Sequence, residues 1–184
     1  RCAEPPMALR ATVYRADLTV SDLDRGVYSQ HALTLARHPS ETEERLMVRL
    51  LAFALHADEG LAFGRGLSTE DEADLWQRDA TGTLERWIDV GLPAEKDIRK
   101  ACGRAREVVV LAYGARRVEQ WWSDNAAALS RLANLKVLTL TNAETEALQA
   151  LAERSMTLTC TVQEGHVWLA SERTTAEIAA VRRQ

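Results

Sequence analysis

The segment Trp87-Ile88-Asp89-Val90-Gly91-Leu92-Pro93 holds the residue whose position most strongly suggests chemistry. Asp89 lies inside a stretch that otherwise has the pattern of a buried strand, and a Gly-Leu-Pro turn follows. A second acid, Asp74, lies upstream, and Glu41 and Glu44 lie in a predicted helix. Carboxylates from separate elements can bind a divalent metal ion, which activates water and phosphate in phosphodiester hydrolysis. These acids therefore suggest a site for phosphodiester chemistry.

Each acid also has an explanation that involves no chemistry. Asp89 could be a solvated residue at the end of a strand, and Asp74 could belong to an exposed acidic loop. Glu41 could only complement the dipole of its helix. Glu44 lies on the flank of the apolar helix face, which is harder to explain as a surface position. The pattern alone leaves both interpretations open.

Hydrophobic periodicity predicts the elements that would position these acids. Apolar residues at helical spacing predict helices over 40–59, 94–105, 116–132 and 142–154. Apolar runs predict strands over 9–20, 27–37, 61–63, 84–90, 108–113 and 135–140, and a final hairpin over 156–170. Strands alternate with helices from residue 84 to 142, which is typical of parallel pairing, whereas hairpins at both ends need antiparallel strands. The expected fold is one α/β domain over residues 7–182, with a mixed central β-sheet flanked by helices.

The predicted helix over 40–59 has a capping-box signature at its start. Ser40 can accept a hydrogen bond from the helix backbone, and Glu43 follows three residues later. Glu43 is therefore assigned to the cap and left out of the predicted site.

Composition narrows the class of protein. The chain has 184 residues, 46% of them apolar, so it can bury the core of one domain. Its formal net charge is −4, so any nucleic acid must bind to a local patch. Three isolated cysteines favour a reduced, cytoplasmic setting, and no apolar run is long enough to span a membrane. Residues 1–6 are interpreted as an upstream extension.

The chain resembles the YaeQ family of bacterial proteins, and the resemblance covers residues 7 to about 180. Five segments in order along the chain carry it: His38-Pro39-Ser40-Glu41-Thr42-Glu43-Glu44-Arg45, Trp87-Ile88-Asp89-Val90-Gly91-Leu92-Pro93, Ile98-Arg99-Lys100-Ala101-Cys102, Trp121-Trp122 and Met156-Thr157-Leu158. The resemblance implies a variant of the PD-(D/E)XK nuclease fold. Nucleases of that class share the order helix, three strands, helix, strand. The predicted elements from residue 40 onward are compatible with that order, from the helix over 40–59 through the strands that end at 84–90 to the helix over 94–105 and the strand over 108–113.

The superfamily motif, carried over by position, implies a set of site residues. Ala73-Asp74 stands where its Pro-Asp would be, and Asp89 stands as the acid of the third strand. Gly91 occupies the position of the motif lysine. Either the basic role passes to the following helix, where Lys100 matches the family motif, or the site is degenerate. The helical wheel places Arg99 nearer the buried face.

The resemblance thus implies Asp74, Asp89 and Glu44 as ligands of Mg²⁺ or Mn²⁺, and adds Glu41, Lys100 and Arg99 as further catalytic candidates. A basic cluster could guide a phosphate backbone, or it could be a solvated face. Its members are Arg99, Lys100, Arg104, Arg106, Arg116 and Arg117. Similarly, Trp121-Trp122 could be a stacking platform, but a pair of this kind is more often part of a core.

Two functions follow from these residues. The first is a metal-dependent nuclease or related phosphodiesterase. The second is a catalytically degenerate protein of the same fold that binds nucleic acid or a protein partner, in transcription or repair. Gly91 in place of the motif lysine favours the second, and the retained acids favour the first.

Overall fold

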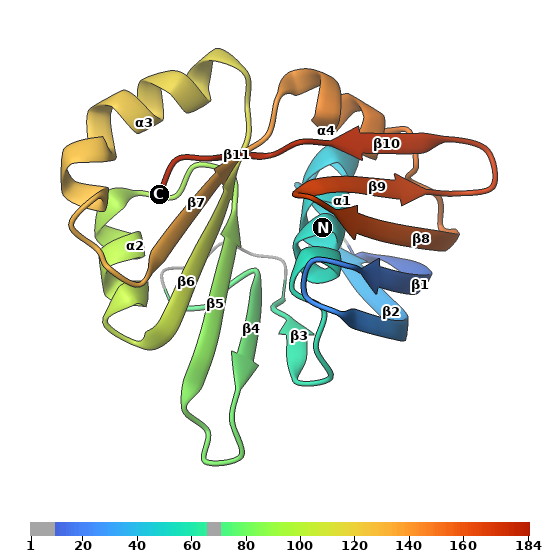
Figure 1. Cartoon of the computed structure of the whole chain (residues 1–184), viewed down its shortest axis with the longest axis horizontal. Helices are drawn as coiled ribbons and strands as arrows, with labels where there is room; N and C mark the ends of the chain where they lie inside the picture. The colour runs from blue at the N-terminus through green and yellow to red at the C-terminus, as the bar shows by residue number, and fades with distance from the viewer. Residues whose placement is uncertain (1–9, 66–70) are drawn as a thin grey trace, which may run out of the picture.

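The computed structural model describes residues 10–65 and 71–184, and the extension predicted over 1–6 lies outside the described residues. The described chain forms two mixed β-sheets with helices between and beside them (Figure 1). The prediction of a single α/β domain with mixed strands and flanking helices is confirmed. The prediction of one central sheet is wrong.

The first sheet has five strands in the order β10-β9-β8-β1-β2. Its strands are β1 (Thr12–Asp22), β2 (Val27–Arg37), β8 (Ser155–Gln163), β9 (His166–Ala170) and β10 (Thr175–Ile178). β1 pairs parallel with β8, and the other pairs are antiparallel. The two predicted hairpins therefore pair with each other and leave the central strands to form a second sheet.

The second sheet has six strands in the order β11-β7-β6-β5-β4-β3. Its strands are β3 (Leu61–Phe63), β4 (Leu75–Arg78), β5 (Leu84–Val90), β6 (Ala105–Ala112), β7 (Leu135–Thr139) and β11 (Val181–Arg182). β5, β6 and β7 are parallel, as the alternation of strands and helices predicts, and β4 is antiparallel to β5. The strand predicted over 84–90 has the predicted bounds and lies inside this sheet.

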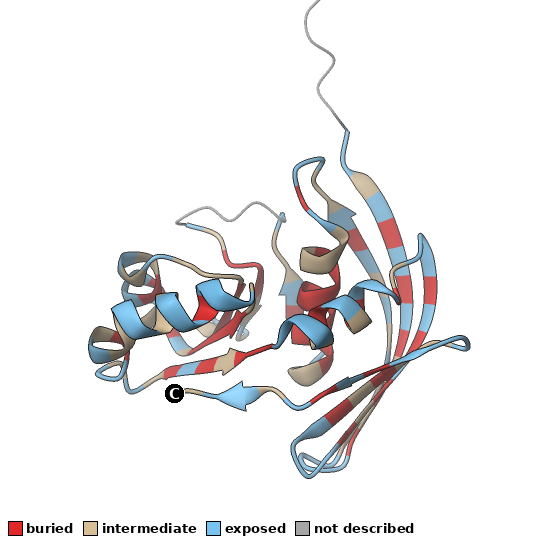
Figure 2. Cartoon of the chain, turned by 90° about the horizontal axis from the view of Figure 1, so that it is seen from above, coloured by how far each residue is buried: buried red, intermediate tan, exposed pale blue. Residues whose placement is uncertain are grey.

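Helix α1 (Glu43–Leu55) lies between the two sheets, and its nine consecutive residues 46–54 are all buried (Figure 2). A helix that is buried all round needs apolar partners on every side, which the two sheets and α4 (Asn142–Gln149) supply. The helix is shorter than the predicted 40–59. Its N-cap is Thr42, whose hydroxyl accepts a hydrogen bond from the backbone N–H of Arg45.

The predicted capping box at Ser40 and Glu43 is therefore wrong. The Ser40 hydroxyl lies 2.6 Å from the Nδ1 atom of His38, so both side chains are engaged in the turn before the helix. Glu43 instead accepts a hydrogen bond of 2.7 Å from the hydroxyl of Tyr14 on β1.

Helices α2 (Glu95–Cys102) and α3 (Arg116–Leu129) cover the other face of the six-stranded sheet. Alternate residues of β6 consequently serve two cores: Val109 and Leu111 face α1, and Val108 and Val110 face α2 and α3. Trp121-Trp122 packs against this second core, as the core interpretation expects. No helix in the described part of the chain is long and apolar enough to cross a membrane.

Candidate functional site

The pairing of β4 with β5 brings Asp74 and Asp89 together. The strands are antiparallel, and Leu75 lies opposite Ile88. Asp74 directly precedes β4 and Asp89 is the next-to-last residue of β5, so the start of one strand lies beside the end of the other. Because residues alternate along a strand, Asp89 shares the face of Trp87, towards α2, while Ile88 and Val90 enter the core around α1.

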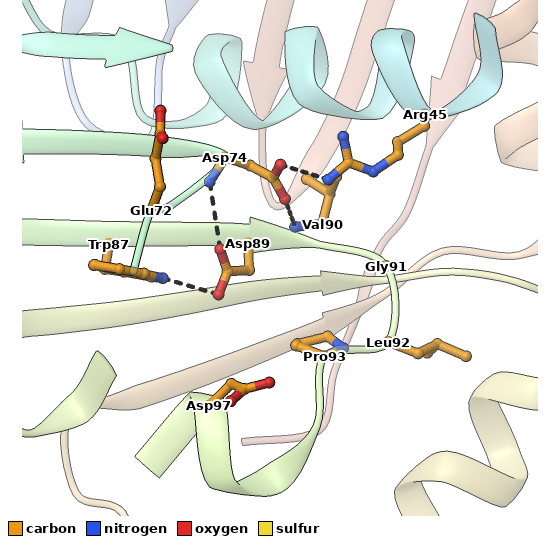
Figure 3. A pocket seen from close by; sticks show the side chains of 10 residues that line it. All are labelled: Arg45, Glu72, Asp74, Trp87, Asp89, Val90, Gly91, Leu92, Pro93 and Asp97. Carbon is orange, nitrogen blue, oxygen red and sulfur yellow. Dashed lines mark hydrogen bonds and ion pairs between the residues drawn. The ribbon is translucent and has the colours of Figure 1, made fainter. Parts of the chain in front are cut away.

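Hydrogen bonds fix the orientation of both carboxylates (Figure 3). The Oδ1 atom of Asp89 accepts a hydrogen bond of 3.3 Å from the backbone N–H of Asp74, and its Oδ2 atom accepts one of 2.8 Å from the Trp87 indole. The Oδ2 atom of Asp74 accepts a hydrogen bond of 2.8 Å from the backbone N–H of Val90. The two side chains are thus oriented by groups of the same sheet edge.

This environment changes the acidity of Asp89. Burial of its carboxyl group, followed by the negative charge of Asp74, raises its pKa from 3.8 to about 6. The hydrogen bonds from Trp87 and from the Asp74 backbone oppose the rise but do not cancel it. The structure therefore holds two carboxylates close enough to repel each other.

Arg45, on α1, supplies a cation to this pair. Its guanidinium contacts the Oδ1 atom of Asp74 at 2.5 Å and the Oε1 atom of Glu41 at 2.9 Å. The Arg45 side chain therefore bridges Asp74 and Glu41. Sequence reasoning missed this role, although Glu41 and Arg45 stand four residues apart, a spacing that often marks an ion pair.

Glu41 also has a structural role that its sequence position does not reveal. It precedes α1 and is 7% exposed. The fully buried guanidinium of Arg49 donates two hydrogen bonds of 2.8 Å to its carboxylate and a third, of 3.0 Å, to the carbonyl of Ala36. Glu41 is thus the counter-ion of a buried arginine, an arrangement that breaks down if either partner is removed.

The other predicted residues lie farther from the acidic pair. Glu44 is half-buried on α1 but does not line the pocket that contains Asp74 and Asp89. The Lys100 ammonium contacts the carboxylate of Asp71 at 2.8 Å, and both side chains are exposed.

Arg99 pairs with Glu95 along the exposed side of α2. Lys100 and Arg99 are thus both engaged by acids outside the pocket that contains Asp89. Other members of the predicted basic cluster also have acidic neighbours: Arg104 pairs with Asp71, and Arg106 pairs with Glu85.

The backbone conformation explains why residue 91 is a glycine. Gly91 has φ +102°, a conformation that residues with a side chain rarely adopt. An added Cβ atom would meet no atom within 4 Å, so conformation and not crowding requires glycine here. Glycine at this position is therefore explained without any need for space for a basic group from α2.

A pocket of about 320 Å³ surrounds the two aspartates. Its lining comprises Arg45, Glu72, Asp74, Trp87, Asp89, Val90, Gly91, Leu92, Pro93 and Asp97. The indole of Trp121 on α3 donates a hydrogen bond of 2.9 Å to the carbonyl of Pro93, which holds the loop that closes one side. Asp97 approaches from α2, on the side away from Arg45 (Figure 3). Sequence reasoning did not select Asp97, which has no distinguishing pattern.

The donor atoms of this pocket are compatible with a hydrated Mg²⁺ or Mn²⁺ ion. Mg²⁺ commonly takes one or two protein carboxylates and completes its coordination with water and substrate phosphate. Each oxygen of Asp74 and Asp89 accepts a hydrogen bond, but a carboxylate oxygen has two lone pairs. Within residues 10–65 and 71–184 there is no group of three or more His, Cys, Asp or Glu side chains arranged to hold a metal. Any ion here would thus depend on two aspartates.

Known proteins resemble this chain over nearly its whole length. The family model described as YaeQ protein matches residues 7–180. The "Uncharacterized protein YaeQ" of Salmonella typhi is 46% identical over 172 residues, which are 94% of this chain and 95% of that protein. The protein of the same name from Escherichia coli (strain K12) is 44% identical over the same shares of the two chains.

Two crystal structures have the same fold. The YaeQ protein from Xanthomonas axonopodis pv. citri superposes with a TM-score of 0.92 at 53% identity, over 95% of this chain and 98% of that one. The YaeQ protein from Pseudomonas syringae superposes with a TM-score of 0.89 at 37% identity, over 95% and 96% of the two chains.

Proposed function

The chain belongs to the YaeQ family, and we propose that it is a Mg²⁺- or Mn²⁺-dependent nuclease or related phosphodiesterase of the PD-(D/E)XK type, whose active site is the pocket around Asp74 and Asp89. The observation that carries the proposal is the pair itself. The buried carboxylate of Asp74, at the start of β4, and the half-buried carboxylate of Asp89, on β5, face one pocket, although Asp74 raises the energy of the ionised form of Asp89. An arrangement that costs stability in this way is typical of a functional site.

The polar groups that contact the two aspartates each have a role in this proposal. Asp74 and Asp89 would hold the ion, which when bound polarises the phosphate and lowers the pKa of a bound water. Trp87 and the backbone N–H groups of Asp74 and Val90 keep the two carboxylates in a fixed orientation.

The positive charge that the superfamily lysine normally supplies would come from Arg45. Its guanidinium already lies against Asp74, and it can donate hydrogen bonds to phosphate oxygens in a fixed planar geometry. An arginine from α1 would therefore replace the lysine that Gly91 excludes. Lys100 and Arg99, the candidates from the sequence, would instead contact the substrate outside the pocket or have no part in the reaction.

The experiment is a cleavage assay on single- and double-stranded DNA and RNA with Mn²⁺ or Mg²⁺. Wild type should cleave at least one substrate, and Asp89→Ala and Asp74→Ala should abolish the cleavage. Asp17→Ala is the matched control because Asp17 is an exposed aspartate of β1, on the other sheet. Cleavage that persists in both active-site variants would show a contaminating nuclease and would refute the proposal, as would no cleavage of any substrate.

A second candidate function is binding of nucleic acid or a protein partner without cleavage. The observation that favours it is the contact of Lys100 with Asp71 and of Arg99 with Glu95, which leaves the motif lysine without a replacement from α2. In that case wild type and the Asp89→Ala variant would bind a nucleic acid or partner equally well, and neither would cleave nucleic acid.

A further inference from the structure

A second pocket, of about 370 Å³, adjoins the acidic pocket and has a different chemistry. Its walls include Trp76, Arg78, Trp87, Arg104 and Asp71, and the last two form an ion pair at the pocket's exposed side. Trp87 lines both pockets, and its indole N–H donates to Asp89 on the acidic side. The two pockets are thus neighbours along the same face of β4 and β5, and their volumes fall within the range of small-ligand sites.

The register of the strands sets the spacing between the pockets. Trp76 of β4 lies directly opposite Trp87 of β5, and Trp87 precedes Asp89 by two residues. At about 3.4 Å per residue in an antiparallel strand, Trp76 is displaced from the acidic pair by roughly 7 Å along the sheet. A chain that places a phosphate at Asp89 would therefore place its next unit at Trp76.

The second pocket offers an aromatic surface and positive charge together. The Trp76 side chain is partly exposed, and its ring meets Trp87 edge to face, with centroids 6.2 Å apart and planes at 77°. The guanidinium of Arg78 lies 5.0 Å from the Trp76 ring centroid, and Arg78 itself is exposed. A cationic group therefore already lies over the Trp76 ring, and an exposed side chain can move aside for another group.

We propose that this pocket binds an unpaired nucleobase, which stacks on Trp76 while Arg78 and Arg104 contact the adjoining phosphates. The proposal rests on the proposed function, because it places the neighbouring phosphate in the acidic pocket. It adds that the substrate is single-stranded, since bases inside a duplex are stacked on each other and cannot enter a side-chain pocket. Stacking on tryptophan with nearby arginine is the usual chemistry of sequence-tolerant single-strand binding.

The test is binding of a fluorescently labelled oligothymidylate to the full chain in EDTA, measured by anisotropy. Removing one stacking contact costs about 5- to 150-fold in affinity, which is the loss expected for Trp76→Ala. Trp76→Phe, which keeps an aromatic ring, should retain most of the affinity. Arg78→Gln should weaken binding and reduce its dependence on salt. A duplex of the same length should bind more weakly than the single strand.

Trp168→Ala is the matched control, because Trp168 is a partly exposed tryptophan of β9 in the other sheet. Circular dichroism establishes that each variant is folded. If Trp76→Ala does not fold, Trp76→Phe and Arg78→Gln still decide the question.

Two results separate this inference from the nuclease proposal. Binding that depends on Trp76 without any cleavage would support the subsite and refute the nuclease. Cleavage that depends on Asp89, with unchanged affinity in folded Trp76→Ala and Arg78→Gln, would refute the subsite alone. Failure of wild type to bind any single strand would also refute the subsite.

Discussion

We expect the effect of Asp89→Asn on the stability of the metal-free protein to depend on pH. The free energy of unfolding of the variant, relative to that of wild type, should be higher at neutral pH than in acid. The variant removes the charge and keeps the size of the side chain. In wild type the pKa of Asp89 is raised to about 6, against 3.8 for an ordinary aspartate. Between these two pH values the folded protein holds a proton that the unfolded chain has lost. Wild-type stability therefore falls as pH rises from about 4 to about 6.

The size of this effect follows from the shift in pKa. One unit corresponds to about 1.4 kcal/mol, so a shift from 3.8 to about 6 costs about 3 kcal/mol once Asp89 is fully ionised above pH 6. The uncharged asparagine of the variant does not titrate and has no such cost. Its amide NH₂ would lie near a backbone or indole N–H, so two hydrogen-bond donors would face each other. This destabilises the variant by the same amount at every pH. The informative quantity is thus the change in the stability difference between acid and neutral pH.

The assay is urea denaturation in EDTA from about pH 4 to pH 8, for wild type and Asp89→Asn. The free energy of unfolding of the variant should rise relative to wild type by about 3 kcal/mol over this range, or about 6 to 12 °C in Tm for a chain of this size. Asp17→Asn, at an exposed position of β1, is the control for a general loss of negative charge, and surface changes of this kind are usually worth less than about 0.5 kcal/mol. Parallel pH profiles for wild type and Asp89→Asn would refute the reasoning.

Three further predictions concern the packing around the site. Arg49→Met should destabilise the protein by about 3–5 kcal/mol in urea denaturation, because it removes two hydrogen bonds to the buried Glu41 carboxylate and leaves only Arg45 to balance its charge; adding Glu41→Gln should recover part of the loss, and equal stability of the single and double variants would contradict the pairing. Gly91→Ala should lower stability by about 1 kcal/mol or more through its backbone conformation, whereas Gly103→Ala, at φ −77°, should not; equal melting temperatures would contradict this. Tyr14→Phe should cost about 1 kcal/mol through the lost hydrogen bond to Glu43, and an unchanged urea midpoint would show that the bond contributes nothing.

The sequence alone determined the local elements and the family. The apolar runs and the helical periodicity are local signals, and they correctly predicted the strand over 84–90, the parallel pairing that follows it and the final hairpin. The ordered motifs from residue 38 to residue 158 led to the family. The local patterns depend on residues that are close in the chain, and the family match depends on a long series of motifs. Neither signal depends on how distant segments pack.

Only the tertiary structure decided how these elements combine. Two terminal hairpins can pair with central strands or with each other, and the alternating pattern is the same in both cases, so the division into two sheets was not predictable. The sequence also did not show that the Ser40 hydroxyl contacts His38 and that Thr42 caps the helix.

The tertiary structure also decided which side chains meet at the site. Arg45 became the cation beside Asp74 because α1 packs against the start of β4. Lys100 met Asp71 because α2 presents it to the loop and not to the pocket. The residue types that could do chemistry can be identified in the sequence. Which of them share a site depends on the directions of side chains from elements far apart in the chain, and only the packing of those elements sets these directions.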